Sequence, residues 1–513
     1  MFENTYNGKR IAKNTLLLYI RMLFLMAVNL FTSRVILLAL GVEDFGIYNV
    51  VGGFVALFAI VSKSLSGAAS RFLNFEMGRG DNERLKTVFS SIVSIQVLLS
   101  VIIVFLAETI GLWFLNNEMV MSDERMIAAN WCFQLSIITF CSNLLTIPYN
   151  ASIIAHEKMA AFAYISIFEG LAKLGIAYLI FFSRFDRLIF YAILICILQL
   201  MIQCYYRLYC LMNFDECKFH FVKDMALLKL LLSYSSWGFI GSASSVLRNQ
   251  GINVLINLFF GPAINAARAV SNQVLHAVDG FVNNFITAVR PQIVMSYASG
   301  DYDYVNKLVV QSAKFSFYLF FTLSLPIIVN CEYILSVWLS VVPDHSVLFV
   351  QLTLIYALIT TLSHPLSIAQ AATGRIRNYQ LVIGGLQLLN LPVSYLSLKF
   401  GAPVESVLIV AVLIAFIVVL VSIHMIKKIL LFDSTLFYKE VVAKVFIVTI
   451  ICMVPLFLMH TLCSKTFIFF IIETVICIVM STIVIYYIGL TAVDRKILGS
   501  GVKLFIKKIS KNE

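Results

Sequence analysis

The chain has 513 residues, of which 60% are hydrophobic and only 13% charged. Soluble domains carry about 25% charged residues, so this chain lacks the polar surface to cover a soluble fold. The net charge of +11 comes from basic residues that lie between apolar segments. This placement favours membrane topology over nucleic-acid binding. We therefore expect an all-α integral membrane protein without a separate soluble domain.

The first apolar run follows Lys9, Arg10 and Lys13, an arrangement that also occurs in secretory signal peptides. The run extends from Leu16 to Leu40, which is longer than the apolar core of a signal peptide, about 7–15 residues. No A-x-A cleavage pattern follows it. The sequence therefore predicts an uncleaved first span.

A helix that crosses a bilayer needs about 20 mostly apolar residues. The sequence contains about 14 such candidates, joined by short loops, and the seventh and eighth are unusually polar. In chain order, the expected transmembrane helices are 14–40, 45–66, 88–109, 126–149, 160–182, 188–210, 230–258, 263–289, 308–329, 347–370, 378–398, 406–426, 441–462 and 466–488.

The basic residues test this topology, because cytoplasmic loops are enriched in Lys and Arg. If both termini are cytoplasmic and the spans alternate, most basic residues outside the spans fall on the cytoplasmic side. The opposite side holds only Arg125, Arg184, Arg187, Lys399 and Lys465. The asymmetry supports an even number of spans and cytoplasmic termini.

An internal repeat relates spans one to six to spans seven to twelve. The Gly80-Asp81 and Gly300-Asp301 pairs are 220 residues apart, and Pro148 and Pro365 are 217 apart. Because six spans is an even number, both halves have the same orientation, which is a known transporter plan. We expect an N-terminal six-helix lobe at 1–212, a second lobe at 213–428, and two extra spans with a basic tail at 429–513.

The eighth span carries a polar stripe at helical spacing, from Asn265 through Arg268, Asn272, His276, Asp279 and Asn283 to Arg290. Spans one, two and seven also contain polar residues. Such residues often join helices by hydrogen bonds, and this remains the favoured reading for a single Asn or Ser. For the full stripe we expect the wall of a watered cavity between the lobes, because charge inside a membrane is costly and normally used.

The expected cavity is rich in cations. Glu169 and Lys173 are four residues apart and should neutralise each other, so Asp279 is the main acidic residue near the cavity. An unpaired buried cation favours an anionic ligand, and arginine suits phosphate. We predict an anionic headgroup site formed by Arg21, Arg34, Lys63, Arg248, Arg268, Asn249, Asn253 and Asn272, although Arg34 and Lys63 lie near span ends and could instead extend to the interface.

The sequence lacks a P-loop, the common hydrolase and metalloprotease motifs and a dinucleotide fingerprint. We expect no catalytic residue, metal or cofactor, and transport driven by ion, voltage or substrate gradients. His276 and Asp279, three residues apart on the polar stripe, form either an ion-coupling pair or a static hydrogen-bonded pair.

The sequence resembles the Wzx-type polysaccharide transporters, which are lipid-linked oligosaccharide flippases of bacterial envelopes. They belong with MATE exporters and peptidoglycan precursor flippases in the multidrug/oligosaccharidyl-lipid/polysaccharide (MOP) exporter superfamily. The resemblance covers residues 10–426. It is carried by Lys13-Asn14-Thr15, the stretch GVEDFGIY at 41–48, Gly80-Asp81, Arg268 with Asn272-Gln273, and Gly300-Asp301.

This resemblance implies two six-helix lobes around a central cavity and alternating access by rocking of the lobes. It implies that cationic residues, by position Arg21, Arg248 and Arg268, hold the pyrophosphate of an undecaprenyl-linked oligosaccharide of O-antigen, capsule or a similar polymer. The expected location is the bacterial inner membrane. The expected partners are the lipid-linked oligosaccharide, membrane lipids and polysaccharide polymerase machinery, without nucleic acid.

Four other functions stay open from the sequence. A MATE-like multidrug exporter of cations should have an acidic cavity, whereas this one is expected to be basic. A peptidoglycan precursor flippase would share the basic cavity. A membrane polysaccharide polymerase or ligase should carry a long periplasmic loop, which the sequence lacks. A scaffold role would leave the buried charge unexplained.

Overall fold

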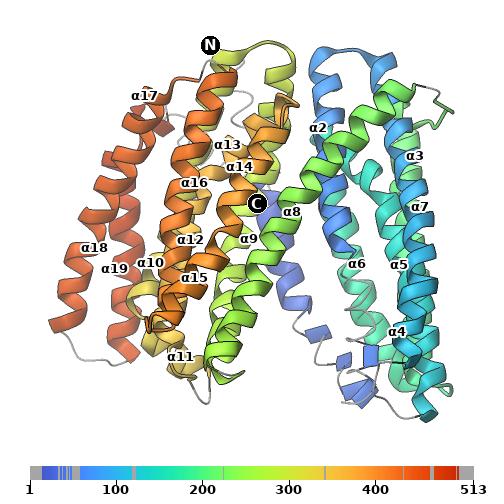
Figure 1. The fold of residues 1–513 in the computed structure, drawn as a ribbon, viewed down its shortest axis with the longest axis horizontal. Helices are drawn as coiled ribbons and strands as arrows, with labels where there is room; N and C mark the ends of the chain where they lie inside the picture. The colour runs from blue at the N-terminus through green and yellow to red at the C-terminus, as the bar shows by residue number, and fades with distance from the viewer. Residues whose placement is uncertain are drawn as a thin grey trace, which may run out of the picture. The chain divides into compact units, whose positions relative to one another are not determined.

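The computed structural model describes residues 14–29, 31–32, 35–36, 38–41, 44, 47–48, 58–117, 123–222, 224–260, 262–339, 342–430, 432–462, 467–492 and 494–495. Within these ranges the chain is built of helices and contains no strand (Figure 1). This confirms the expected all-α fold class.

A helix at Asn14–Asn29 begins the described part of the chain. The elements that follow are α2 (Ala59–Arg79), α3 (Asn82–Leu106), η1 (Ala107–Gly111), α4 (Leu112–Asn117), α5 (Asp123–Ala155), α6 (Met159–Leu179), η2 (Ile180–Phe182), α7 (Arg187–Asn213), η3 (Asp215–Cys217), α8 (Met225–Phe260), α9 (Pro262–Ala298), α10 (Tyr302–Val329), α11 (Cys331–Trp338), α12 (Ser346–Thr361), α13 (Ser363–Ala372), α14 (Arg377–Leu388), α15 (Asn390–Lys399), α16 (Ser406–Leu430), α17 (Ser434–Phe437), η4 (Tyr438–Ala443), α18 (Lys444–Leu462), α19 (Phe467–Val484) and η5 (Ile485–Gly489).

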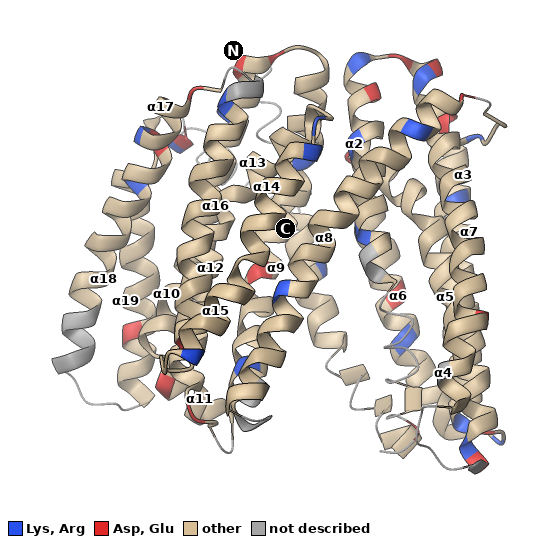
Figure 2. Ribbon diagram, in the orientation of Figure 1, with Lys and Arg blue, Asp and Glu red and all other residues tan. Residues whose placement is uncertain are grey.

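Nine helical stretches among the described residues are long and apolar enough to cross a membrane. Figure 2 shows Lys, Arg, Asp and Glu mainly toward the ends of α7 and α16, as expected for helices with an apolar middle. The polar helices α8 and α9 are not among the nine, although each has the length to span a bilayer at about 1.5 Å per residue. The full count of 14 spans therefore stays a prediction.

Several helices end elsewhere than the apolar runs suggest. α2 continues to Arg79 and α9 to Ala298, beyond the expected ends at 66 and 289. The expected span 378–398 is divided into α14 and α15 at Leu389. Hydropathy locates the apolar middle of a helix, but its ends follow backbone hydrogen bonding, which continues into polar sequence.

The two turns at the repeated Gly-Asp pairs have the same structure. Gly80 and Gly300 both adopt the left-handed conformation, with φ of 74° and 83°. The next residue caps the following helix in each case: Asp81 accepts from the Arg84 N–H at 2.9 Å and Asp301 from the Tyr304 N–H at 3.0 Å. Glycine adopts this conformation without the steric cost of a Cβ. The structure thus supports the repeat at a point where sequence alone suggested it.

The chain forms two compact units, Leu16–Ser242 and Met1–Thr15 with Ala243–Glu513. The division falls inside α8, whose second half belongs with the later helices. In the unit of residues 16–242, α5 packs against α2, α3 and α7. The three-part division expected from the sequence stays a prediction.

In the unit that contains residues 243–513, α9 packs against α10, α12 and α13, and α16 packs against α12 to α15. The C-terminal helices α18 and α19 pack against each other and against α10. A buried ion pair joins this C-terminal part to α10: Lys314 Nζ lies 2.6 Å from Asp494 Oδ2, and the two side chains are only 2% and 1% exposed.

Candidate anion-binding site

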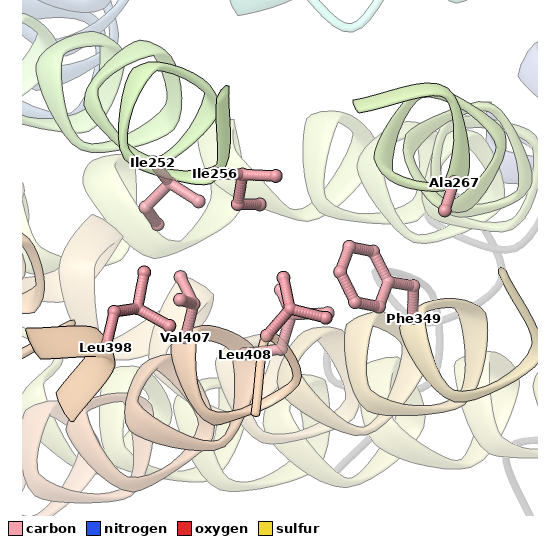
Figure 3. Packing of buried hydrophobic residues seen from close by; sticks show 8 residues of the cluster. Ile252, Ile256, Ala267, Phe349, Leu398, Val407 and Leu408 are labelled. Carbon is pink, nitrogen blue, oxygen red and sulfur yellow. The ribbon is translucent and has the colours of Figure 1, made fainter. Parts of the chain in front are cut away.

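Two arginines of the polar seventh and eighth spans are brought together where α8 and α9 meet. An apolar cluster holds this junction in place: Ile252 and Ile256 of α8 and Ala267 of α9 pack with Phe349 of α12 and Leu408 of α16 (Figure 3). Burying apolar surface away from water stabilises the folded unit by about 25 cal/mol for each Å². The gain is smaller for surface that would otherwise contact lipid. The cluster thereby fixes the helix turns that carry Arg248 and Arg268.

Arg248 lies on α8 and is only 9% exposed. Its guanidinium donates to the Tyr356 hydroxyl of α12 through Nη1 and to Asn249 Oδ1 through Nη2 at 3.1 Å. The guanidinium carbon also lies 5.0 Å from the centre of the Tyr356 ring, within the range of a cation–π interaction. Its Nε is buried and has no hydrogen-bond partner within the ranges that the structure describes.

Arg268 lies on α9 and is 6% exposed. Its Nε donates to Asn253 Oδ1 of α8 at 2.5 Å, and the Asn253 amide in turn donates to Gln250 Oε1 at 3.1 Å. Asn253 therefore joins the end of α8 to the start of α9 and orients the second guanidinium. Both contacts use uncharged acceptors.

Neither guanidinium is paired with a carboxylate among the residues that the structure describes. The two arginines are also close enough to repel each other. A buried cation without a counter-ion is unfavourable, and two such cations together are more so. The arrangement is therefore suited to an anion with several oxygen acceptors, because the guanidinium presents its donors in a planar fork.

Three other predicted residues follow Arg268 along α9. Asn272 is half-buried and one helical turn beyond Arg268. His276 is exposed, and Asp279 accepts a hydrogen bond from Asn283 at 2.7 Å. This partner is consistent with a hydrogen-bonded role for Asp279, and the coupling role of the two residues stays a prediction.

The predicted cations of the first two spans belong to the other unit. Arg21 packs on the ring of Phe162 at 4.3 Å, within electrostatic range of Glu169. Glu169 pairs with Lys173 at 2.6 Å, which confirms the pairing expected from their spacing. Lys63 is exposed on α2, and Arg34 lies outside the described residues. Arg21 thus has a nearby carboxylate, whereas no described carboxylate pairs with Arg248 or Arg268.

Sequence analysis did not identify Tyr356, which contacts Arg248 with both its hydroxyl and its ring. It lies in the apolar run of α12, where a tyrosine is ordinarily read as a core or interface residue. No spacing rule relates it to Arg248, 108 residues earlier. Within the described residues, no three His, Cys, Asp or Glu side chains come together as metal ligands.

The family model for polysaccharide biosynthesis proteins matches residues 11–296, more than half of the chain. The chain belongs to this family. The matched region includes both arginines and their partners on α8 and α9, but ends before Tyr356. No curated protein matches the chain.

Solved structures of MOP-type transporters share the fold. A MATE protein in complex with MaD3S superimposes with a TM-score of 0.71 at 12% identity, covering 82% of this chain and 97% of that one. The MATE transporter ClbM in complex with Rb⁺ gives 0.70 at 16% identity, covering 83% and 96%. A MOP superfamily transporter from Pyrococcus furiosus, described as having a binding pocket of reverse polarity that suggests a different function, gives 0.69 at 11% identity, covering 83% and 96%.

At sequence identities this low, the similarity to these solved structures establishes the fold alone. Together with the family match and the apolar helices, it identifies a multi-pass membrane protein and supports a transporter of the MOP type. The resemblance noted in the sequence is thereby confirmed.

Proposed function

We propose that this protein moves an undecaprenyl-pyrophosphate-linked oligosaccharide from the cytoplasmic to the periplasmic leaflet of the bacterial inner membrane by alternating access. The observation that carries the proposal is the pair of buried arginines, Arg248 and Arg268, whose hydrogen-bond partners in the described part of the chain are uncharged. The polysaccharide biosynthesis family supplies the class of cargo. The sugar would be a repeating unit of O-antigen, capsule or a similar polymer.

The chemistry of the site favours a phosphate-bearing headgroup over a cationic drug. A cation entering near Arg248 and Arg268 would be repelled, whereas a pyrophosphate accepts several charge-assisted hydrogen bonds. The neighbouring amides of Asn249 and Asn253 provide further polar contacts. One structural neighbour is described as having a pocket of reverse polarity, so the fold is compatible with pockets of different charge.

In the proposed cycle the lipid tail stays in the bilayer while the headgroup crosses through the protein. The protein acts as a secondary transporter and makes or breaks no covalent bond. Both chain termini lie in the cytoplasm, as the distribution of basic residues favours. Arg21, Lys63 and Asn272 are secondary candidates for headgroup contact, as is Arg34.

The decisive experiment starts in a strain that lacks this gene. Undecaprenyl-pyrophosphate-linked oligosaccharide should accumulate while the surface polysaccharide disappears, and the wild-type gene should reverse both effects. A leaflet-accessibility assay on the accumulated lipid then separates a block in translocation from a block in polymerisation. Unchanged lipid and polymer together with sensitivity to cationic compounds would instead indicate a drug exporter.

The site is tested in the same strain with Arg248→Ala and Arg268→Ala. Each variant should reach the membrane at normal abundance and reduce translocation by about tenfold or more, because loss of one charged hydrogen bond to the headgroup removes about 1.5–3 kcal/mol. Arg184→Ala, outside the site on the expected periplasmic surface, is the matched control. Wild-type translocation by both site variants would remove these arginines from the proposed site.

A further inference from the structure

A pocket lies within the unit of residues 16–242, the unit that does not contain the two site arginines. It is formed by α3 with its continuation η1, by α5 and by α7, of which α5 packs against both other helices (Figure 1). Its volume of about 290 Å³ is near the lower end for small-molecule sites, about 300–1,000 Å³. The walls of this α3–α5 pocket are mostly aliphatic: Val104, Ile137, Ile138, Leu145 and Leu200.

The charged side chain that lines the pocket is Glu108. It lies in η1, a π-helical turn from Ala107 to Gly111, and such turns are frequent at functional sites. Gln134 Nε2 of α5 donates to Glu108 Oε2 at 3.0 Å. Among the described residues, no Lys or Arg forms an ion pair with this carboxylate. A carboxylate has about four acceptor positions, so Gln134 leaves most of them for a ligand.

The surface of the helix around Glu108 is apolar and exposed. Phe105 and Ile110 are 65% and 59% exposed, as expected where a membrane helix meets lipid tails. A carboxylate on such a surface is unfavourable unless a cationic partner reaches it. By the proposed topology, this end of the third span lies toward the periplasm. The partner would therefore come from the outer leaflet of the membrane.

A neutral polar pair lines another part of the same pocket. Ser142, about two helical turns beyond Gln134 on α5, donates to Gln203 Oε1 of α7 at 2.8 Å. Because Gln203 accepts through its oxygen, its amide nitrogen can donate to an ester or other neutral carbonyl. The pocket thus combines a carboxylate, a neutral donor and an aliphatic wall. This combination is suited to an amphiphile with a cationic head.

We propose that the α3–α5 pocket binds a membrane phospholipid whose headgroup ends in a primary ammonium. The ammonium donates to Glu108, and part of an acyl chain lies along the aliphatic wall. A primary ammonium has three N–H donors, and its hydrogen bonds to a carboxylate are about twice as strong as neutral ones. A quaternary ammonium has no donor, and an anionic headgroup is repelled. The bound lipid joins α3 to α5 and α7, whatever substrate the protein carries.

The test measures lipid binding by the purified full-length protein in detergent, with native mass spectrometry. The lipid probes are phosphatidylethanolamine, phosphatidylcholine and phosphatidylglycerol with identical chains, and the soluble probe is O-phosphoethanolamine. The wild type should bind phosphatidylethanolamine about tenfold more tightly than the other two lipids, because only its headgroup forms charge-assisted hydrogen bonds to the carboxylate. O-phosphoethanolamine should bind far more weakly, since it lacks the chains. Transport is not measured, so failure of the proposed function would not affect the result.

Three variants locate the binding. Glu108→Gln keeps the shape of the side chain and should abolish the preference for phosphatidylethanolamine. Ile138→Phe narrows the pocket and should weaken binding of this lipid about fivefold or more. Glu124→Gln, at an exposed position near the start of α5, is the matched control and should keep the preference. Equal binding of the three lipids by the wild type, or an unchanged preference in Glu108→Gln, would overturn the proposal. Binding of O-phosphoethanolamine as tight as that of the lipid would also overturn it.

Discussion

Two buried cationic groups in the same compact unit differ in what surrounds them. Lys314 is paired with Asp494, which also accepts from Gln311 at 3.0 Å and from the Thr491 N–H at 3.0 Å. Among the residues that the structure describes, the side-chain hydrogen bonds of Arg248 and Arg268 instead go to tyrosine and asparagine side chains. A buried charge that is neutralised by the protein serves the fold, whereas one left without a counter-ion is available to a ligand.

This comparison is most directly tested by removing the neutralised charge. Lys314→Ala leaves Asp494 buried without its partner, so the free energy of unfolding in detergent should fall by about 3–5 kcal/mol. Lys173→Ala breaks an ion pair whose side chains are 38% and 27% exposed, and it should cost at most about 1 kcal/mol. A paired Lys314→Met/Asp494→Leu variant should recover most of the loss. Wild-type stability of Lys314→Ala would contradict the distinction.

The reverse change gives the arginine site a carboxylate. Asn253→Asp places a negative charge at the acceptor that lies 2.5 Å from Arg268 Nε, in a side chain of the same shape. Stability should rise by about 1 kcal/mol, because charge-assisted hydrogen bonds are roughly twice as strong as neutral ones. Translocation should fall about tenfold, since the new carboxylate competes with the anionic headgroup.

The control for that change is Asn213→Asp, which adds the same charge at the exposed end of α7. Translocation and stability are measured on the same preparations. A gain in translocation by Asn253→Asp would show that the substrate headgroup is not anionic.

A smaller effect is expected at Tyr356. Tyr356→Phe keeps the ring against Arg248 but removes the hydroxyl that accepts its hydrogen bond. Loss of this hydrogen bond, which orients the guanidinium, should cost about 1 kcal/mol. Translocation should therefore fall about fivefold. Tyr395→Phe, on the exposed face of α15, should leave translocation unchanged. If both variants behave alike, Tyr356 is only a packing residue.

The smallest effect concerns acid pH. Burial alone would raise the pKa of Asp494, but the hydrogen bond and charge of Lys314, with hydrogen bonds from Thr491, outweigh burial and hold that pKa below its ordinary value of 3.8. The stability contributed by Asp494 is then fully present above pH 3.8 and is lost as the pH falls through the lower, folded-state value. The difference in stability between wild type and Asp494→Asn should therefore be constant above about pH 5 and shrink only below about pH 4. A difference that grows on acidification would contradict the assignment.

Sequence reasoning selected Arg268 as a candidate because the polar stripe of the eighth span follows a helical period. The spacing of Arg268, Asn272 and His276 places them on one face of a helix. In the structure, Arg268 is buried near the start of α9. The same reasoning placed Arg21 beside Arg248 and Arg268 in importance. Only the structure distinguished them, since it gives Arg21 an aromatic contact with Phe162 and a nearby Glu169.

Local pattern was sufficient where the physics is local. Apolar runs predicted membrane helices, the Gly-Asp pairs indicated equivalent points of an internal repeat, and the spacing of Glu169 and Lys173 predicted their ion pair. Contacts between segments that are distant in the sequence could not be predicted from local pattern. The pairing of Lys314 with Asp494, 180 residues later, and of Arg248 with Tyr356, 108 residues later, follows no periodicity along the chain. These contacts arise from the packing of α8, α10 and α12 against their neighbours, which brings together side chains whose chemistry is complementary only once the helices are in place.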